Sequence, residues 1–260
     1  MMNPVLETIH QRKSVRAYED KPVPEDVRDV ILKSAMRAPT AGNMMLYSII
    51  EVADQEAKNK LVETCDNQPF IAEAPLVLIF LADYQRWYDY FILSGVEQFC
   101  EEKDLQMVKP EEGDLFLACC DALIAAQTSV IAAESLGVGS CYIGDILENY
   151  EIHREMFDLP QYAVPICMVC FGYPTKEQKE REQTERFGEE FILYKDQYTR
   201  LGEDEFNEMY TGMQERMTAG SVEMHDQSNV GIRMYKRKFS AEYSVEMRRS
   251  VRAILDAWVA

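Results

Sequence analysis

The feature that most constrains the fold is a long segment, residues 115–136, in which apolar side chains lie on nearly every face of a helix. A helix that is apolar nearly all round belongs inside a protein. Small residues, which let another helix approach closely, recur along it at spacings of three and four, at Ala118, Ala122, Ala125, Ala126, Ser129, Ala132 and Ala133. We therefore expect a buried central helix that Gly137 ends in the left-handed conformation, which glycine adopts easily.

Other segments have the patterns of ordinary strands and helices. The longest wholly apolar run, 76–82, has the length of a buried strand. Two further strands are predicted at 46–52 and 163–171. Helices are predicted at 4–11, from Pro24 to the residue before Pro39, and at 55–64, 148–157 and 245–258. Strands that alternate with helices make the chain α/β or α+β.

Several segments carry more specific expectations. Leu6 and Ile9 of the first helix should face inward, and the second helix should have an inner stripe of Val27, Val30, Ile31, Ser34 and Ala35. The segment 84–113 is interpreted as a helical insertion or lid and 176–186 as an exposed loop. A boundary near residue 200 would divide a main domain, 1–200, from a C-terminal extension, 201–260.

Composition excludes some classes of protein. The 260 residues carry a formal net charge of -18, which argues against nucleic-acid binding because that function needs a basic surface. No continuous apolar run reaches the roughly 20 residues that span a bilayer, and the N-terminus lacks the pattern of a signal peptide, so we expect a cytoplasmic protein. Cys167 and Cys170 have metal-like spacing, but on a strand they point to opposite faces, which favours a structural role.

A cationic cluster stands out in this acidic chain. Residues 12–16 read Arg-Lys-Ser-Val-Arg. In an extended stretch Arg12, Ser14 and Arg16 would point the same way, and guanidinium and hydroxyl groups suit a phosphate. The plainer alternative is a solvated helix end whose cations complement the helix dipole.

Two further segments suit the same kind of ligand. Residues 39–43, Pro-Thr-Ala-Gly-Asn, form a turn of small residues with a hydroxyl and an amide. Residues 137–144 hold three glycines, which would let the backbone lie flat on a planar ring and donate N–H groups to it. Their spacing is neither a dinucleotide fingerprint nor a P-loop. Each segment taken alone also fits an ordinary turn.

These three segments, in this order, resemble the nitroreductase family of FMN enzymes over about residues 6–187. The sequence is most similar to the larger, oxygen-insensitive and flavin-reductase-like branch, because Gln68 and Arg186 also match it. The resemblance implies an α+β fold with a central mixed sheet flanked by helices. It also implies a homodimer with FMN at the subunit interface and a C-terminal arm, 201–260, that wraps the partner.

The resemblance also implies roles for individual residues. The FMN phosphate and ribityl chain would be held by Arg12, Lys13, Ser14, Arg16 and Arg186. The flavin ring would be contacted by Gln68, Tyr142, Ile143 and Gly144, and by Pro39, Thr40, Ala41 and Asn43 of the partner subunit. The sequence departs from the family pattern at Met44 and Met45, where a Gln-Pro pair is common, and at Thr184, where a lysine is common.

The implied reaction is a ping-pong hydride transfer from NADH or NADPH, through flavin N5, to an electron-poor acceptor such as a nitroaromatic, a quinone or a flavin. The flavin carries this chemistry, so no catalytic side chain is expected. Trp87, Tyr88 and Phe91 could roof the site or serve the core equally well. Two alternatives remain: a specialised reductase or dehalogenase of the same fold, and a flavin-binding dimer without catalysis.

Overall fold

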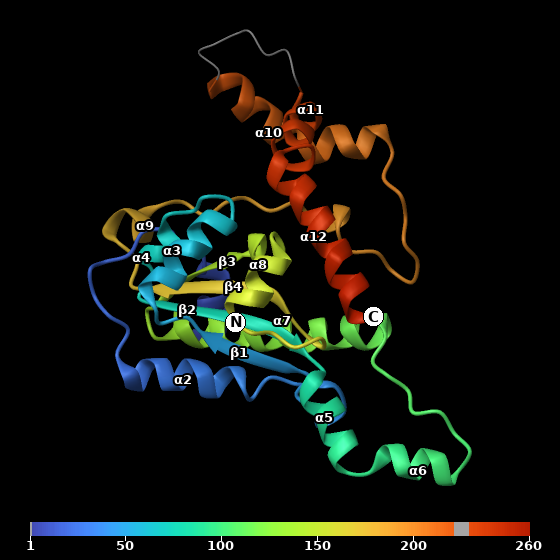
Figure 1. The fold of residues 1–260 in the computed structure, drawn as a ribbon. Coiled ribbons are helices and arrows are strands. Elements are labelled where there is room, and N and C mark those ends of the chain that lie inside the picture. Colours follow the sequence, from blue (N-terminus) through green and yellow to red (C-terminus); the bar gives the residue numbers. More distant parts are fainter. Residues whose placement is uncertain (1, 221–228) are drawn as a thin grey trace. The chain divides into compact units, whose positions relative to one another are not determined.

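The computed structural model describes residues 2–220 and 229–260, with the backbone alone for 218–220. The chain forms two compact units, Met1–Glu182 with Glu246–Ala260, and Gln183–Val245 (Figure 1). The first unit therefore has two boundaries, after Glu182 and before Glu246, and it includes the C-terminal residues Glu246–Ala260. The sequence suggested a single boundary near residue 200.

The first unit is built on one four-stranded sheet. Its strands are β1 (Tyr47–Glu51), β2 (Leu76–Asp83), β3 (Gly139–Ile143) and β4 (Ala163–Gly172), in the order β1-β2-β4-β3. The three strands predicted from sequence are confirmed, and so is the α+β class. The expected mixed sheet is wrong for these strands, because every pairing between them is antiparallel. The glycine-rich segment, expected to be a bend, forms edge strand β3.

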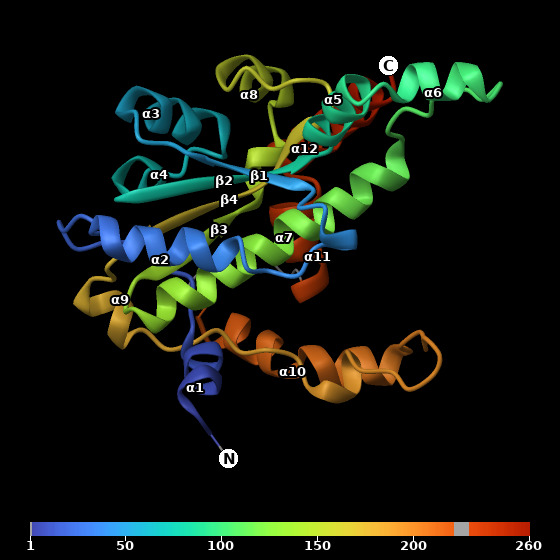
Figure 2. The same ribbon diagram turned by 90° about the horizontal axis from the view of Figure 1, so that it is seen from below.

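Helices cover both faces of the sheet (Figure 2). One face packs on α2 (Glu25–Ala35) and α7 (Glu112–Ser135), with Ile31, Phe80 and Ala126 among the buried contacts. The other face packs on α3 (Gln55–Thr64) and α4 (Phe70–Glu73). Side chains of η2 (Gly144–Leu147) and α8 (Tyr150–Met156) belong to the same hydrophobic cluster. The part of α12 (Glu242–Trp258) that belongs to this unit buries Ile254 and Trp258 against Tyr150 and Tyr162.

Helix α7 is only half buried, contrary to expectation. Six of its seven small residues are buried within the same chain and are not available to a second molecule, whereas Ala132 is half-buried. The opposite face leaves Phe116, Leu117, Leu123 and Ile124 exposed. By length and composition α7 is the one helix among the described residues that could cross a membrane. The burial of its other face is that of a core helix.

Two other helices expose residues that were expected to be buried. The N-cap prediction for α1 (Pro4–Gln11) is confirmed, because Asn3 Oδ1 accepts a hydrogen bond of 3.0 Å from the Leu6 backbone N–H. However, Leu6 and Ile9 are exposed, since α1 buries no residue within this chain. In α2, Ile31 and Ala35 are buried, whereas Val30 is exposed and Ser34 is half-buried.

The remaining elements are helical. The insertion at 84–113 contains α5 (Gln85–Leu93) and α6 (Val96–Glu102), as predicted. The stretch 176–186 begins with a short helix, α9 (Lys176–Glu180), rather than being loop throughout. The second unit contains η3 (Glu189–Phe191), α10 (Glu203–Gly220), α11 (Val230–Met234) and a π-helical turn, η4 (Tyr235–Phe239).

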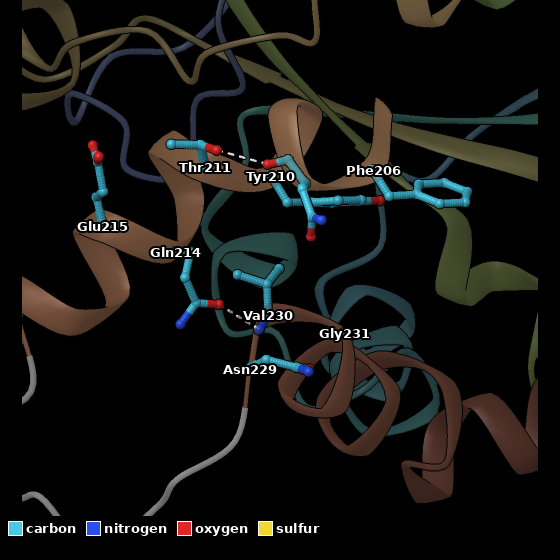
Figure 3. Close-up of a pocket in the computed structure, with 9 residues that line it drawn as sticks. Phe206, Tyr210, Thr211, Gln214, Glu215, Asn229, Val230 and Gly231 are labelled. Carbon is cyan, nitrogen blue, oxygen red and sulfur yellow. Dashed lines mark hydrogen bonds between the residues drawn. The ribbon is translucent and has the colours of Figure 1, made fainter. Parts of the chain in front are cut away.

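Within the second unit, α10 and α11 line an open pocket of about 850 Å³ (Figure 3). The N–H of Val230 donates a 3.0 Å hydrogen bond to Gln214 Oε1 across it. Apolar and polar side chains share the lining, which includes Phe206, Tyr210 and Thr211.

Candidate functional site

The cationic segment is attached to the edge of the sheet. The Val15 N–H donates a 2.8 Å hydrogen bond to the Ser140 carbonyl, and Ser14 forms an isolated parallel bridge with Ser140. Gly139 permits this approach, because a Cβ there would lie 2.5 Å from Val15 Cγ2. The side chain of Val15 is buried, so it anchors the segment in the core. The first and third segments singled out from the sequence therefore meet in space.

The cations of this segment gather around Cys141 in β3. Burial raises the pKa of the Cys141 thiol, while Arg16, a hydrogen bond with Ser14, Arg12 and then Arg181 oppose that rise. A charge influences a pKa in this way only from nearby, so Arg12, Ser14, Arg16 and Arg181 all lie in the neighbourhood of Cys141. Arg12 also acts on the neighbouring Glu134, although burial dominates and raises the pKa of that carboxyl.

The segment after β4 completes this cluster with a residue that sequence reasoning missed. Arg181 follows α9, and its Nη2 donates to the Ser14 carbonyl. Lys13 Nζ donates to the carbonyl of Lys179, at 2.7 Å, and to that of Arg181. The ammonium of Lys13 therefore fixes α9 and the residues after it beside the cluster. The charged stretch 176–186 was the available signal, but it was interpreted as a loop.

Arg186, the expected member of the phosphate clamp, belongs to the second unit. Its Nη1 donates to the carbonyls of Thr184 and Glu185, at 3.3 and 3.4 Å. Its role therefore stays a prediction, whereas Arg181 reaches the cluster within the first unit.

The turn at 39–46 is held by a buried acid that the sequence analysis also missed. Asp121 of α7 is 2% exposed and accepts hydrogen bonds from Ala41 N and Leu46 N, both at 3.0 Å, and from the Thr40 hydroxyl. The feature of the sequence that could have pointed to Asp121 is the presence of an acidic residue among the alanines of that helix.

The same turn has an unusual backbone. Gly42, Asn43 and Met45 have positive φ values of 56°, 57° and 52°, in a backbone region that residues other than glycine seldom adopt. The Thr40 hydroxyl, which also accepts from Met45 N at 2.8 Å, serves to hold this turn. Within η1 (Ala41–Asn43), Asn43 is the member whose side chain is exposed, and Pro39 before it is exposed too.

The residues predicted to contact a flavin ring lie on β3 and on the segments beside it. Tyr142 is half-buried, and its hydroxyl donates to Gln127 Oε1 at 3.2 Å. The side chain of Ile143 is 1% exposed and packs in the core, so it could meet a ligand only through its backbone. Gly144, which follows it, is exposed.

Gln68 connects to this strand through an acid. Its Nε2 donates to Asp145 Oδ2 at 2.7 Å and to the Cys65 carbonyl at 3.1 Å. Asp145 directly follows Gly144, so the amide of Gln68 is bound to the segment that leaves β3. Nearby, Glu148 is buried, and burial together with Asp145 and Asp66 raises its pKa to about 8.

The site therefore combines an α+β fold with guanidinium groups beside a glycine-containing edge strand, an arrangement that an anionic ligand such as a phosphate would need. The chain belongs to the nitroreductase family, whose family model matches residues 9–173. It is 30% identical over 217 residues to the FMN reductase [NAD(P)H] of Bacillus subtilis (strain 168), covering 84% of this chain and 82% of that one. It is 28% identical over 202 residues to the oxygen-insensitive NADPH nitroreductase of Salmonella typhimurium, covering 78% of each.

The fold agrees with solved structures of such proteins. The structure of B. megaterium NfrA2 superposes with a TM-score of 0.79 at 28% identity, covering 99% of this chain and 98% of that one. The resemblance stated from the sequence motifs is therefore confirmed at the level of family and fold.

Proposed function

We propose that this protein is an FMN-dependent oxidoreductase that passes reducing equivalents from NADH or NADPH to an electron-poor small molecule. The observation that carries the proposal is the contact of the cationic segment 12–16 with edge strand β3, through Val15 and Ser140, and with Arg181, in a chain whose net charge is -18. Such an acidic chain repels anions overall. A local group of guanidinium side chains is what it would need to hold a phosphate.

The donor set fits FMN. Guanidinium groups bind phosphate through paired N–H donors, and Ser14 adds a hydroxyl beside them. Gln68, Tyr142 and the backbone at Ile143 and Gly144 follow on the same edge of the sheet, where a planar ring would extend from that phosphate. When bound, FMN supplies the acceptance and donation of hydride at its N5 atom. The residues of this chain bind and orient it.

We propose that the enzyme works as a cytoplasmic homodimer. The exposed face of α7, together with α1, forms an apolar groove of about 620 Å³, lined by Val5, Ile124, Ile131 and their neighbours. A contiguous exposed apolar surface is typical of a protein interface. A second copy seated there would also supply the turn at 39–43, with the exposed Asn43, to the neighbouring flavin site.

The test begins with the purified protein. Its absorbance spectrum should show bound flavin, and anaerobic addition of NADH or NADPH should bleach it. Protein that is colourless and takes up no FMN would refute the proposal. Flavin that stays oxidised with both nicotinamides would instead favour the non-catalytic flavin-binding dimer.

Variants then test the phosphate cluster. Arg181→Ala should weaken FMN binding about tenfold or more, because a hydrogen bond to a charged group contributes about 1.5–3 kcal/mol. Lys176→Ala removes an exposed cation from the adjacent α9 and serves as the matched control. Equal FMN affinity in the two variants would show that Arg181 does not bind the phosphate.

A further inference from the structure

The orientation of the Gln68 amide is determined by its neighbours. Its Nε2 lies 2.7 Å from a carboxylate oxygen of Asp145 and 3.1 Å from the Cys65 carbonyl, and both of these groups accept hydrogen bonds. The two N–H groups of the amide are therefore occupied. Among the described residues none donates to Gln68 Oε1, so the atom left for a ligand is an acceptor. An oxidised isoalloxazine ring offers an N–H that such an acceptor can bind.

Asp145 is in turn adjacent to a second, more deeply buried carboxyl group. Glu148 is 4% exposed, and its Oε1 finds no hydrogen-bond donor in the described part of the chain. The two residues are held close together, because the Glu148 backbone N–H donates a 3.0 Å hydrogen bond to the Asp145 carbonyl, and after burial the Asp145 charge is the largest cause of the raised pKa of Glu148. Two ionised carboxylates this close repel strongly, so one of them retains its proton. Glu148 is the one shielded from water, and its proton can be donated to Asp145.

The other charges that face Glu148 do not remove the need for that proton. Asp66, from the turn after α3, and Glu246, from α12, both disfavour its ionised form. Arg249 is already bound to Glu151 and Glu246, at 2.7–2.8 Å. The surroundings of Glu148 are therefore acidic from three elements, and its pKa is raised to about 8.

We propose that Glu148 is a positioning residue whose proton, shared with Asp145, keeps Asp145 against Gln68 and so presents the Gln68 carbonyl to the flavin ring. Loss of that proton at alkaline pH would place two like charges side by side. Asp145, the more exposed of the pair, would turn toward water and release the amide. The inference rests on the proposed function, because it assumes that Gln68 contacts FMN.

The test is the affinity for FMN as a function of pH, measured by quenching of flavin fluorescence between pH 6.5 and 9.5, with free FMN as the reference. The wild type should lose about threefold to tenfold in affinity through a single step near pH 8, which is the contribution of one neutral hydrogen bond. Glu148→Gln retains a donor toward Asp145 but cannot ionise. It should bind like the wild type at pH 6.5 and show no step.

A second variant separates positioning of Gln68 from a general effect of charge. Gln68→Ala should bind FMN more weakly at every pH and should also lack the step. A step that persists in Glu148→Gln, or one that persists unchanged in Gln68→Ala, would overturn the inference. So would a wild type that binds FMN and is bleached by NAD(P)H but has constant affinity over this range. A wild type that binds no FMN at any pH refutes the proposed function instead.

Discussion

Removal of the Asp121 carboxylate should destabilise the protein more than most single substitutions do. Three donors point at this acid: Ala41 N, Leu46 N and the Thr40 hydroxyl. A hydrogen bond to a charged group contributes about 1.5–3 kcal/mol, and contributions to one group are not additive. Leu46 is fully buried, so in Asp121→Ala its N–H would stay unpaired, whereas water can reach Ala41. We therefore expect a loss of about 3–5 kcal/mol in the free energy of unfolding.

The assay is urea unfolding followed by far-ultraviolet circular dichroism, with and without FMN. Asp121→Asn keeps one acceptor oxygen but turns an NH2 group toward the donors, so it should lose about 2–3 kcal/mol. Cys120→Ala changes the neighbouring, exposed residue of α7 and should stay within about 0.5 kcal/mol of the wild type. A loss below about 1 kcal/mol in Asp121→Ala would refute the view that this acid holds the turn.

Three further predictions concern the sheet edge, the buried acid and the apolar face. Gly139→Ala places a Cβ 2.5 Å from Val15 Cγ2 and should cost about 1–3 kcal/mol and lower the flavin content, measured by thermal unfolding and absorbance. Folding raises the pKa of Glu148 from 4.5 to about 8, so the folded protein favours the neutral form of this side chain. As pH rises across that window, the wild type should therefore lose stability relative to Glu148→Gln, by at most about 1.4 kcal/mol per pH unit. Equal pH slopes of the free energy of unfolding in the two proteins would contradict this. Ile124→Glu, on the exposed face of α7, should yield monomers in sedimentation analysis, and an intact dimer would exclude this face as the interface.

The sequence was most informative where local rules decide the structure. Apolar runs of strand length in the sequence predicted β1, β2 and β4, because such a run is most stable as a strand in the core of a protein. Asn3 capped α1, and Gly137 adopts a positive φ of 75°, since both depend on backbone groups only a few residues away. The motifs that suggested the nitroreductase family also needed only their order along the chain.

The outcome was different where a residue's role depends on a distant partner. Periodicity showed that α7 is apolar on several faces, but it could not tell which face meets the sheet and which is exposed. The glycines at 137–144 suggested a bend, yet pairing with β4 makes most of that segment a strand.

The sequence by itself determined three of the four strands, most of the helices of the first unit, the family and the existence of a cationic segment, because each follows from residues close together in the chain. Only the tertiary structure decided that Arg181 joins that segment, that Asp121 holds a turn about eighty positions earlier, and that Glu148 lies buried beside Asp145. The physical reason is that hydrogen bonds, burial and pKa shifts depend on distance in space, and folding brings together groups that no local pattern relates.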